Sequence, residues 1–142
     1  MLRIAALAAA AAGAFAAVAA PGTAAEVISF RTPSGNIGCY YAAGLDSQNS
    51  IRCDIRTGLR PRPAKPARCD LDWGDSYELA ATGRAILTCH GDTAINPHAR
   101  VLRYGSTWRR GGLTCASRVA GLRCHNRSGH GFFLSRQHSY RF

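Results

Sequence analysis

Apolar and polar residues alternate in two segments that surround the first pair of cysteines. Segments 37–41 and 51–55 each place an apolar residue or a cysteine at every odd position. This period of two is typical of a β-strand with one buried side. If Cys39 faces Cys53 in an antiparallel hairpin, the odd positions of both segments share one apolar face. The other face is expected to be solvated, and it carries Gly38, Tyr40, Arg52 and Asp54.

The same register argument applies to Cys115 and Cys124. Placing these cysteines opposite each other leaves 118–121 as a four-residue turn, in which Gly121 supplies conformational freedom. Directly opposed residues in an antiparallel pair have Cα atoms ~4.5–5.5 Å apart, which a disulfide can bridge. The outward side of this hairpin is expected to be solvated, and it carries Thr114, Ala116, Arg123 and His125.

The rest of the chain reads as short strands separated by turns, with no sustained helical period after the first residues. Segment 58–68 contains three prolines and predicts an extended surface connection. The segment 134–140 is expected to add at most a single helical turn. The fold class predicted is all-β, a small disulfide-stabilised antiparallel barrel or sandwich built from hairpins. Further strands are expected at 27–31, 77–80, 84–89, 101–104, 112–116, 121–125 and 131–134.

Cys69 and Cys89 are left to pair by elimination. One geometry is a hairpin in which the two cysteines face each other and Leu71 lies against Leu87. In the other, 77–79 and 85–87 form their own hairpin, and Cys69 lies on a neighbouring segment. The sequence leaves both open.

The N-terminal residues resemble a secretory signal. Positions 1–25 hold one basic residue, Arg3, and no acid, followed by a mostly alanine apolar run. An uncleaved membrane anchor is the alternative, but the run is short and alanine partitions weakly into lipid. Cleavage after Ala25 is favoured over cleavage after Ala20, so the chain divides into a signal peptide, 1–25, and one disulfide-rich β domain, 26–142.

Six cysteines in a small exported chain indicate a disulfide framework. The pairs expected are Cys39–Cys53, Cys69–Cys89 and Cys115–Cys124. Structural zinc sites usually contain a C-x-x-C pair, and this sequence has none, so no metal and no other cofactor is expected. The predicted location is the periplasm or the extracellular medium, and the predicted oligomeric state is a monomer without a transmembrane segment after the leader.

The net charge of +10 becomes +9 once the leader is removed, and arginine supplies nearly all of it. Guanidinium groups fork onto carboxylate or phosphate, so an anionic partner is physically reasonable. Codon bias in a GC-rich genome and a need for solubility are alternative explanations. The arginines chosen as candidate anion contacts are Arg109, Arg110, Arg118, Arg123 and Arg127.

Two groups of histidines are candidates for chemistry. His90 and Asp92 are two residues apart, so a strand would place both on one face, where the carboxylate can orient the imidazole as a base. A polar turn after Cys89 is the simpler interpretation. His125 and His130 flank the turn 126–129 and, with Arg127, form a set suited to phosphodiester cleavage.

Several blocks of the sequence resemble a known bacterial family of small exported proteins, catalogued only as a domain of unknown function. The blocks are TPSGNIGC from Thr32, CDI from Cys53, WG from Trp73, CHGDT from Cys89, LRYG from Leu102 and GHGF from Gly129. The resemblance covers most of the chain after the leader. It implies export, one domain and six cysteines, and it implies no activity.

Two functions remain as hypotheses. The first is a non-catalytic exported binding or envelope module whose basic surface meets an anionic polymer, a lipid head group or a protein partner. The second is a small basic secreted hydrolase, resembling a ribonuclease or another phosphodiesterase, that uses His125 and His130. No catalytic residue is assigned under the first hypothesis.

Overall fold

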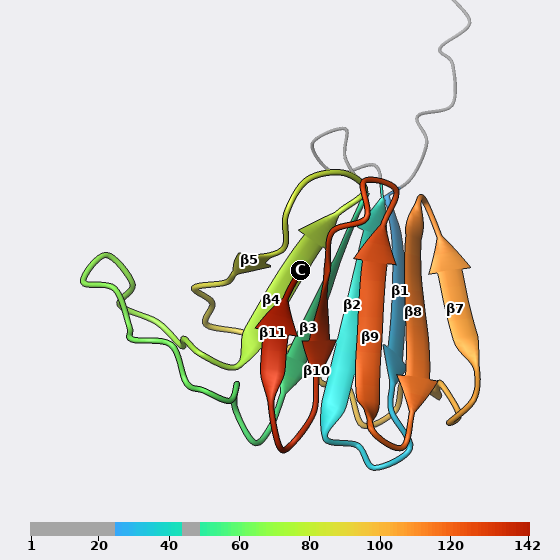
Figure 1. The fold of residues 1–142 in the computed structure, drawn as a ribbon, viewed down its shortest axis with the longest axis horizontal. Helices are drawn as coiled ribbons and strands as arrows, with labels where there is room; N and C mark the ends of the chain where they lie inside the picture. The colour runs from blue at the N-terminus through green and yellow to red at the C-terminus, as the bar shows by residue number, and fades with distance from the viewer. Residues whose placement is uncertain (1–24, 44–48) are drawn as a thin grey trace, which may run out of the picture.

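The computed structural model describes residues 25–43 and 49–142, and the expected signal peptide lies almost wholly outside this part. The described residues form eleven strands in two packed layers, with no helix among them. Figure 1 shows the strands running side by side, with a loop projecting to the left. The strands are β1 (Glu26–Arg31), β2 (Ile37–Ala43), β3 (Ser50–Ile55), β4 (Ser76–Ala80), β5 (Ile86–Leu87), β6 (Arg100–Val101), β7 (Thr107–Arg110), β8 (Leu113–Arg118), β9 (Gly121–Asn126), β10 (Gly131–Leu134) and β11 (Ser139–Arg141).

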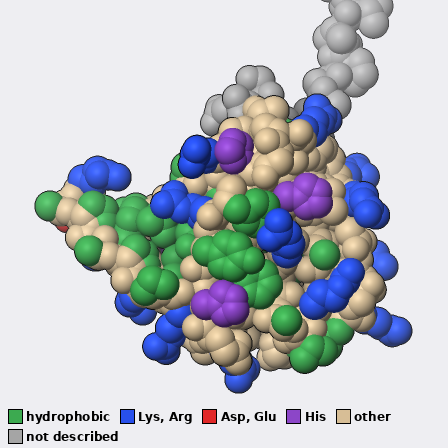
Figure 2. All heavy atoms as spheres, in the orientation of Figure 1, with side chains coloured by type: hydrophobic (Ala, Val, Ile, Leu, Met, Phe, Trp, Pro, Cys, Tyr) green, Lys and Arg blue, Asp and Glu red, His purple; other side chains and the backbone are tan. Residues whose placement is uncertain are grey.

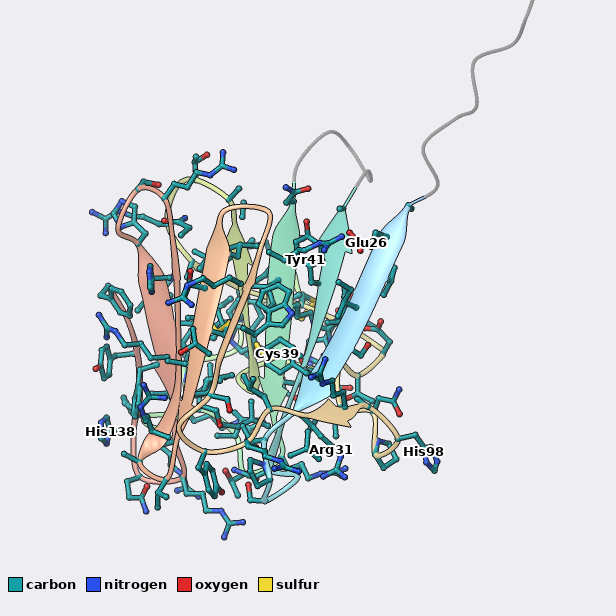
Figure 3. The ribbon with its side chains drawn as sticks, turned by 90° about the vertical axis from the view of Figure 1, so that its right-hand side faces the viewer. Glu26, Arg31, Cys39, Tyr41, His98 and His138 are labelled. Atoms are coloured by element: carbon teal, nitrogen blue, oxygen red, sulfur yellow. A yellow bond between two sulfur atoms is a disulfide. The ribbon has the colours of Figure 1, made fainter. Side chains whose placement is uncertain are left out.

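One layer is a six-stranded sheet in the order β5-β4-β3-β2-β1-β6, and the other is a five-stranded sheet in the order β11-β10-β9-β8-β7. All neighbours are antiparallel except β1 and β6. The two layers are seen edge-on in Figure 3, where Cys39 and Tyr41 point into the space between them. The all-β fold expected from the sequence is confirmed, and because the sheets do not close on themselves it is a sandwich.

The core consists of the inward rows of both sheets. Trp108 of β7 packs against Phe30 and Tyr41, and Tyr77 of β4 packs against Phe132 of β10. The fully buried aliphatic residues include Ile51, Leu79, Leu122 and Leu134. Burying such side chains provides roughly 1.5–3 kcal/mol each relative to exposure, so the apolar alternation in the sequence has a direct energetic basis.

Three disulfides link Cys39 to Cys53, Cys69 to Cys89 and Cys115 to Cys124. These are the pairs expected from the sequence. The first and third each join directly opposed residues of a hairpin, and their Cα atoms are 4.1 Å apart. Cys69–Cys89 instead joins two loops, because Tyr77 pairs with Leu87 in a separate hairpin. The second of the two geometries left open by the sequence is therefore the one observed.

Some expectations of local structure are wrong. Residues 134–140 form no helical turn, because Ser135 closes a tight turn with His138 and the chain returns as β11. Arg109 and Arg110 end strand β7, a strand that the sequence did not predict. The strands expected at 84–89 and 101–104 are reduced to the two-residue strands β5 and β6.

Candidate functional site: the outer face of the five-stranded sheet

The outer face of the five-stranded sheet combines rings with cations. Its outward side chains form rows that run across neighbouring strands, because the register of β7 to β11 places these residues opposite one another. Figure 2 shows this face with a hydrophobic patch near its centre and blue and purple side chains around it. We call this surface the aromatic–basic face and define it by Arg109, Arg123, His125, Arg127, Phe133, His138, Tyr140 and Phe142.

The rings of this face are packed against one another. Phe133 lies directly opposite Tyr140 across the β10–β11 pair, with ring centroids 5.3 Å apart. His138 has its centroid 5.9 Å from that of Tyr140 and its ring plane inclined by only 3° to it. Figure 3 shows His138 on the outer side of the five-stranded sheet. Tyr140 remains 43% exposed, so the cluster presents ring surface to solvent.

Two glycines make room for the phenylalanine rings. A Cβ on Gly121 would meet the backbone oxygen of Leu134 and lie 2.5 Å from a ring carbon of Phe133. One on Gly131 would meet the backbone oxygen of Cys124 and lie 2.7 Å from a ring carbon of Phe142. Each ring therefore covers a position where the sheet has no side chain. A ring above an outward glycine is a recognised way of protecting a sheet at that point, and here it keeps the rings close to the sheet.

Arginines border the rings on one side. The guanidinium carbon of Arg123 lies 3.8 Å from the ring centroid of Phe142, a close cation–π contact. The side chain of Arg127 crosses Gly112, where an added Cβ would come within 2.4 Å of its Nε. A shallow depression of about 400 Å³ lies beside it, lined by residues that include Arg109, Arg110, Thr114, His125 and Arg127.

The five candidate arginines therefore divide into three groups. Arg109 and Arg127 line the depression and Arg123 lies beside the rings, so three of them belong to one surface. Arg110 also reaches the depression, but it forms an ion pair with Glu26 and is partly neutralised. Arg118 lies at the opposite end of the sandwich, in a separate hollow of about 300 Å³ that Arg136 also lines.

The two histidines of the hydrolase hypothesis are placed differently. His125 is exposed on β9 and lines the depression with the arginines. His130 is half-buried in the β9–β10 turn, where its backbone N–H donates to Oδ1 of Asn126, and it is not among the residues that line the depression.

The charges of the chain are strongly divided between its two halves. Residues 26–92 contain all eight acidic residues and eight basic ones, whereas residues 93–142 contain nine arginines and no acidic residue. The whole five-stranded sheet lies in the second part. Its positive charge is therefore not compensated within its own segment.

The outer face of the six-stranded sheet is built in the opposite way. The sequence predicted a solvated side with Arg52 and Asp54, but these side chains are only 4% and 2% exposed. The segment after β5 crosses this face, and a Cβ on Gly38 would lie 2.6 Å from the Cα of Ile95. The expectation failed because a loop distant in sequence covers the polar row.

A network of charged hydrogen bonds holds that segment down. Arg52 donates to both oxygens of Asp54 and to Oδ1 of Asp92, at 2.7 Å. Asp54 also accepts the backbone N–H of Ala94. Burial alone lowers the pKa of Arg52, but its carboxylate partners raise it further than burial lowers it. The hydrogen bond from Arg52 lowers the pKa of Asp92. Such a network leaves little charge for an external ligand.

His90 belongs to this network, but Asp92 does not orient it through its carboxylate. Nδ1 of His90 lies 2.6 Å from the backbone oxygen of Asp92, and Nε2 lies 2.9 Å from Oδ1 of Asp75. Burial lowers the pKa of His90, but the hydrogen bonds to these two acceptors outweigh it and raise the pKa above its usual value. Both ring nitrogens are engaged, so the arrangement is structural, as the simpler interpretation of a polar turn expected.

The fold and this face define a small β-sandwich with three disulfides and a cationic sheet that carries stacked rings. The chain belongs to a family of unknown function, DUF6636, whose model matches residues 5–142. The family resemblance expected from the sequence motifs is thereby confirmed. No curated protein and no solved structure matches the chain. Within the described residues, no helix is long and apolar enough to cross a membrane.

The aromatic half of the face was not found from the sequence. The arginines were chosen because guanidinium groups are recognisable one by one, whereas Phe133, Tyr140 and Phe142 become a cluster only through the β10–β11 pairing. A usable signal was present: His138, Tyr140 and Phe142 place a ring at every second position, as on one face of a strand. The mistaken helical turn at 134–140 concealed it.

Proposed function

We propose that this protein is an exported, non-catalytic binding module that holds an anionic polymer on its aromatic–basic face. One observation carries the proposal: Arg109, Arg123 and Arg127 share the outer surface of a sheet whose entire segment contains no acidic residue. Arginines that lack an internal acidic partner attract external anions, and several on one surface favour a ligand with repeated charges.

Export is supported by two features of the chain. The leader-like residues 1–25 match the pattern of a secretory signal. All six cysteines are engaged in disulfides, which persist in oxidising compartments such as the periplasm and the medium. We place the protein in one of these two compartments.

The proposal predicts a binding energy that depends on salt. Each phosphate neutralised by an arginine releases condensed counterions, so log K falls linearly with log salt concentration. We expect the disulfide-intact protein to bind long-chain inorganic polyphosphate with such a slope. Arg123→Ala and Arg127→Ala should each make the slope shallower by about 0.7–0.9, the change per phosphate contact in nucleic acids. The measurement is titration calorimetry or fluorescence anisotropy between ~50 and ~200 mM salt, a range over which such contacts lose much of their affinity.

Arg100→Ala is the matched control, since Arg100 is an exposed strand arginine on the six-stranded sheet. It should leave the slope unchanged. Binding that does not weaken as salt rises, or an equal loss for Arg100→Ala, would contradict a specific cationic surface on the five-stranded sheet.

A further inference from the structure

The exposed rings of the aromatic–basic face indicate a ligand that has groups able to stack on them as well as negative charge. We propose that its ligand is a single-stranded nucleic acid, whose bases stack on Tyr140 and Phe133 while its phosphates meet Arg109, Arg123 and Arg127. This inference rests on the proposed function and names the class of polymer. It draws on the ring geometry, on the hydrogen-bonding character of the face and on its open shape.

The ring geometry suits flat, unstacked partners. Phe133, His138 and Tyr140 have centroids 5.2–5.9 Å apart and ring planes within 30° of one another, so they form a single cluster of similar orientation. Tyr140 and His138 are exposed. Every nucleobase has a π-face, and stacking on an aromatic side chain contributes about 1–3 kcal/mol per base. Polyphosphate and other polyanions without rings leave this surface unused.

The hydrogen-bonding character argues against a polysaccharide. The outward positions of the five strands carry arginine, histidine, threonine, small residues and rings, with no carboxylate and no amide among them. Sugar hydroxyls donate as well as accept hydrogen bonds, so a polysaccharide site needs acceptors beside its donors, whereas the oxygens of a phosphodiester only accept. A face rich in guanidinium donors and poor in acceptors matches a phosphodiester backbone.

The shape of the face favours a single strand over a duplex. The depression beside Arg127 is shallow and the rings lie on a sheet surface, so the aromatic–basic face has the form of an open platform. In a duplex the base faces are covered by their neighbours, and stacking on protein rings would require unstacking the helix first. Single strands present their bases without that cost, as they do to other ring-bearing sheets.

The rings and the arginines lie side by side, so one strand can place its bases on the rings and its phosphates on the arginines. Arg123 ties the two parts together, because it lies against the ring of Phe142 and on the same cross-strand row as Phe133 and Tyr140. A guanidinium stacked on a ring keeps its edge donors directed outward, where they can bond a phosphate. Bases on the rings and phosphates on the arginines are thus neighbouring contacts.

The test uses the disulfide-intact protein and three labelled probes of equal length: oligo(dT), oligo(rU) and an abasic oligodeoxynucleotide, which keeps the phosphates and lacks the bases. Fluorescence anisotropy at a fixed salt concentration gives the three dissociation constants. We expect oligo(dT) and oligo(rU) to bind at least tenfold more tightly than the abasic strand, and the tighter of the two indicates whether DNA or RNA is preferred. A duplex of the same length should bind more weakly than oligo(dT).

Tyr140→Ala should weaken oligo(dT) binding by about fivefold to 150-fold, the equivalent of one stacked base, and should not change binding of the abasic strand. Tyr104→Ala is the matched control, because Tyr104 is 42% exposed and lies at the other end of the sandwich, and it should bind as the unmodified protein does. Tyr140→Phe keeps the ring and should retain binding, which separates stacking from a folding defect.

Equal affinity for oligo(dT) and the abasic strand would overturn the nucleic-acid inference while leaving the proposed polyanion function intact. Tighter binding of the duplex than of oligo(dT) would overturn it in the same way. Failure of all probes and of polyphosphate would overturn both proposals.

Discussion

The outer faces of the two sheets both carry arginines, but the charge of these arginines is neutralised by carboxylates on only one of the sheets. Both sheets contain a hairpin with a disulfide between directly opposed cysteines, and both bury an apolar inner row. On the six-stranded sheet, Arg52 is paired with Asp54 and Asp92 beneath a covering segment. On the five-stranded sheet, Arg109, Arg123 and Arg127 are exposed in a segment without acids. An arginine therefore indicates a binding surface only when its counter-charge is absent from the fold.

The largest effect that tests this comparison is expected at Arg52. Arg52→Ala leaves the buried carboxylate of Asp54 without its cation, and removing one partner of a buried pair typically costs about 3–5 kcal/mol. The free energy of unfolding, measured in denaturant with the disulfides intact, should fall by that order. Arg123→Ala, on the other sheet, removes an exposed cation–π contact with Phe142 and should change it by no more than about 1 kcal/mol.

A double variant refines the result. Arg52→Ala combined with Asp54→Asn removes both charges, and it should recover part of the stability because no buried ion is left unpaired. Similar losses for Arg52→Ala and Arg123→Ala would show that the two faces are energetically alike and that the comparison is wrong.

A smaller effect is expected where the covering segment touches the six-stranded sheet. Gly38→Ala introduces a Cβ within 2.6 Å of the backbone of Ile95, so the segment must move outward, at a cost of about 1–3 kcal/mol. Amide hydrogen exchange should become faster around Ala94 and Ile95, while β8 and β9 stay unchanged.

Gly91→Ala provides the control for Gly38→Ala. Gly91 lies in the same covering segment, and a Cβ there would meet only Leu71 side-chain atoms at 3.6 Å, an ordinary contact. Stability should therefore be nearly unaffected. A loss at Gly91 as large as that at Gly38 would mean that any change in this segment is harmful and that the close approach at Gly38 is not the cause.

The smallest predicted effect concerns pH. His90 has a raised pKa in the folded protein, so the stability it contributes is fully present below the unfolded value of about 6.5 and is lost as pH rises through the folded pKa. Denaturation midpoints should therefore decline as the pH is raised through this window. In Asp75→Asn, which removes the carboxylate at Nε2, the decline should be smaller and the pKa of His90, followed by NMR, should fall.

Equal pH dependence in the two proteins would show that Asp75 does not set the pKa of His90. The backbone amide signals of β9 serve as an internal reference in the same NMR spectra, because β9 belongs to the other sheet and its signals should not respond to Asp75→Asn.

The hairpins could be predicted from the sequence because their information is local. Cys39 and Cys53, like Cys115 and Cys124, are flanked by alternating residues that specify register and face within a few positions. The burial of Arg52 and Asp54 could not be predicted, because it depends on a segment some 40 positions later in the chain. Individual hydrogen bonds, from Arg52 to Asp92 and from Ala94 to Asp54, hold that segment in place. The arginines of the aromatic–basic face were identified one by one, but their grouping with Phe133 and Tyr140 required the sheet order.

The three disulfides also bear on how the chain is made. The cysteines bond in consecutive pairs, the first to the second, the third to the fourth and the fifth to the sixth, and none of the bonds connects the two sheets. A chain that crosses a membrane from its N-terminus exposes Cys39 and Cys53 first, then Cys69 and Cys89, and finally Cys115 and Cys124. An oxidase that joins cysteines in their order of appearance would thus form the native set directly, without reshuffling by an isomerase. The pairing in this sandwich is therefore compatible with an oxidising environment that contains an oxidase alone.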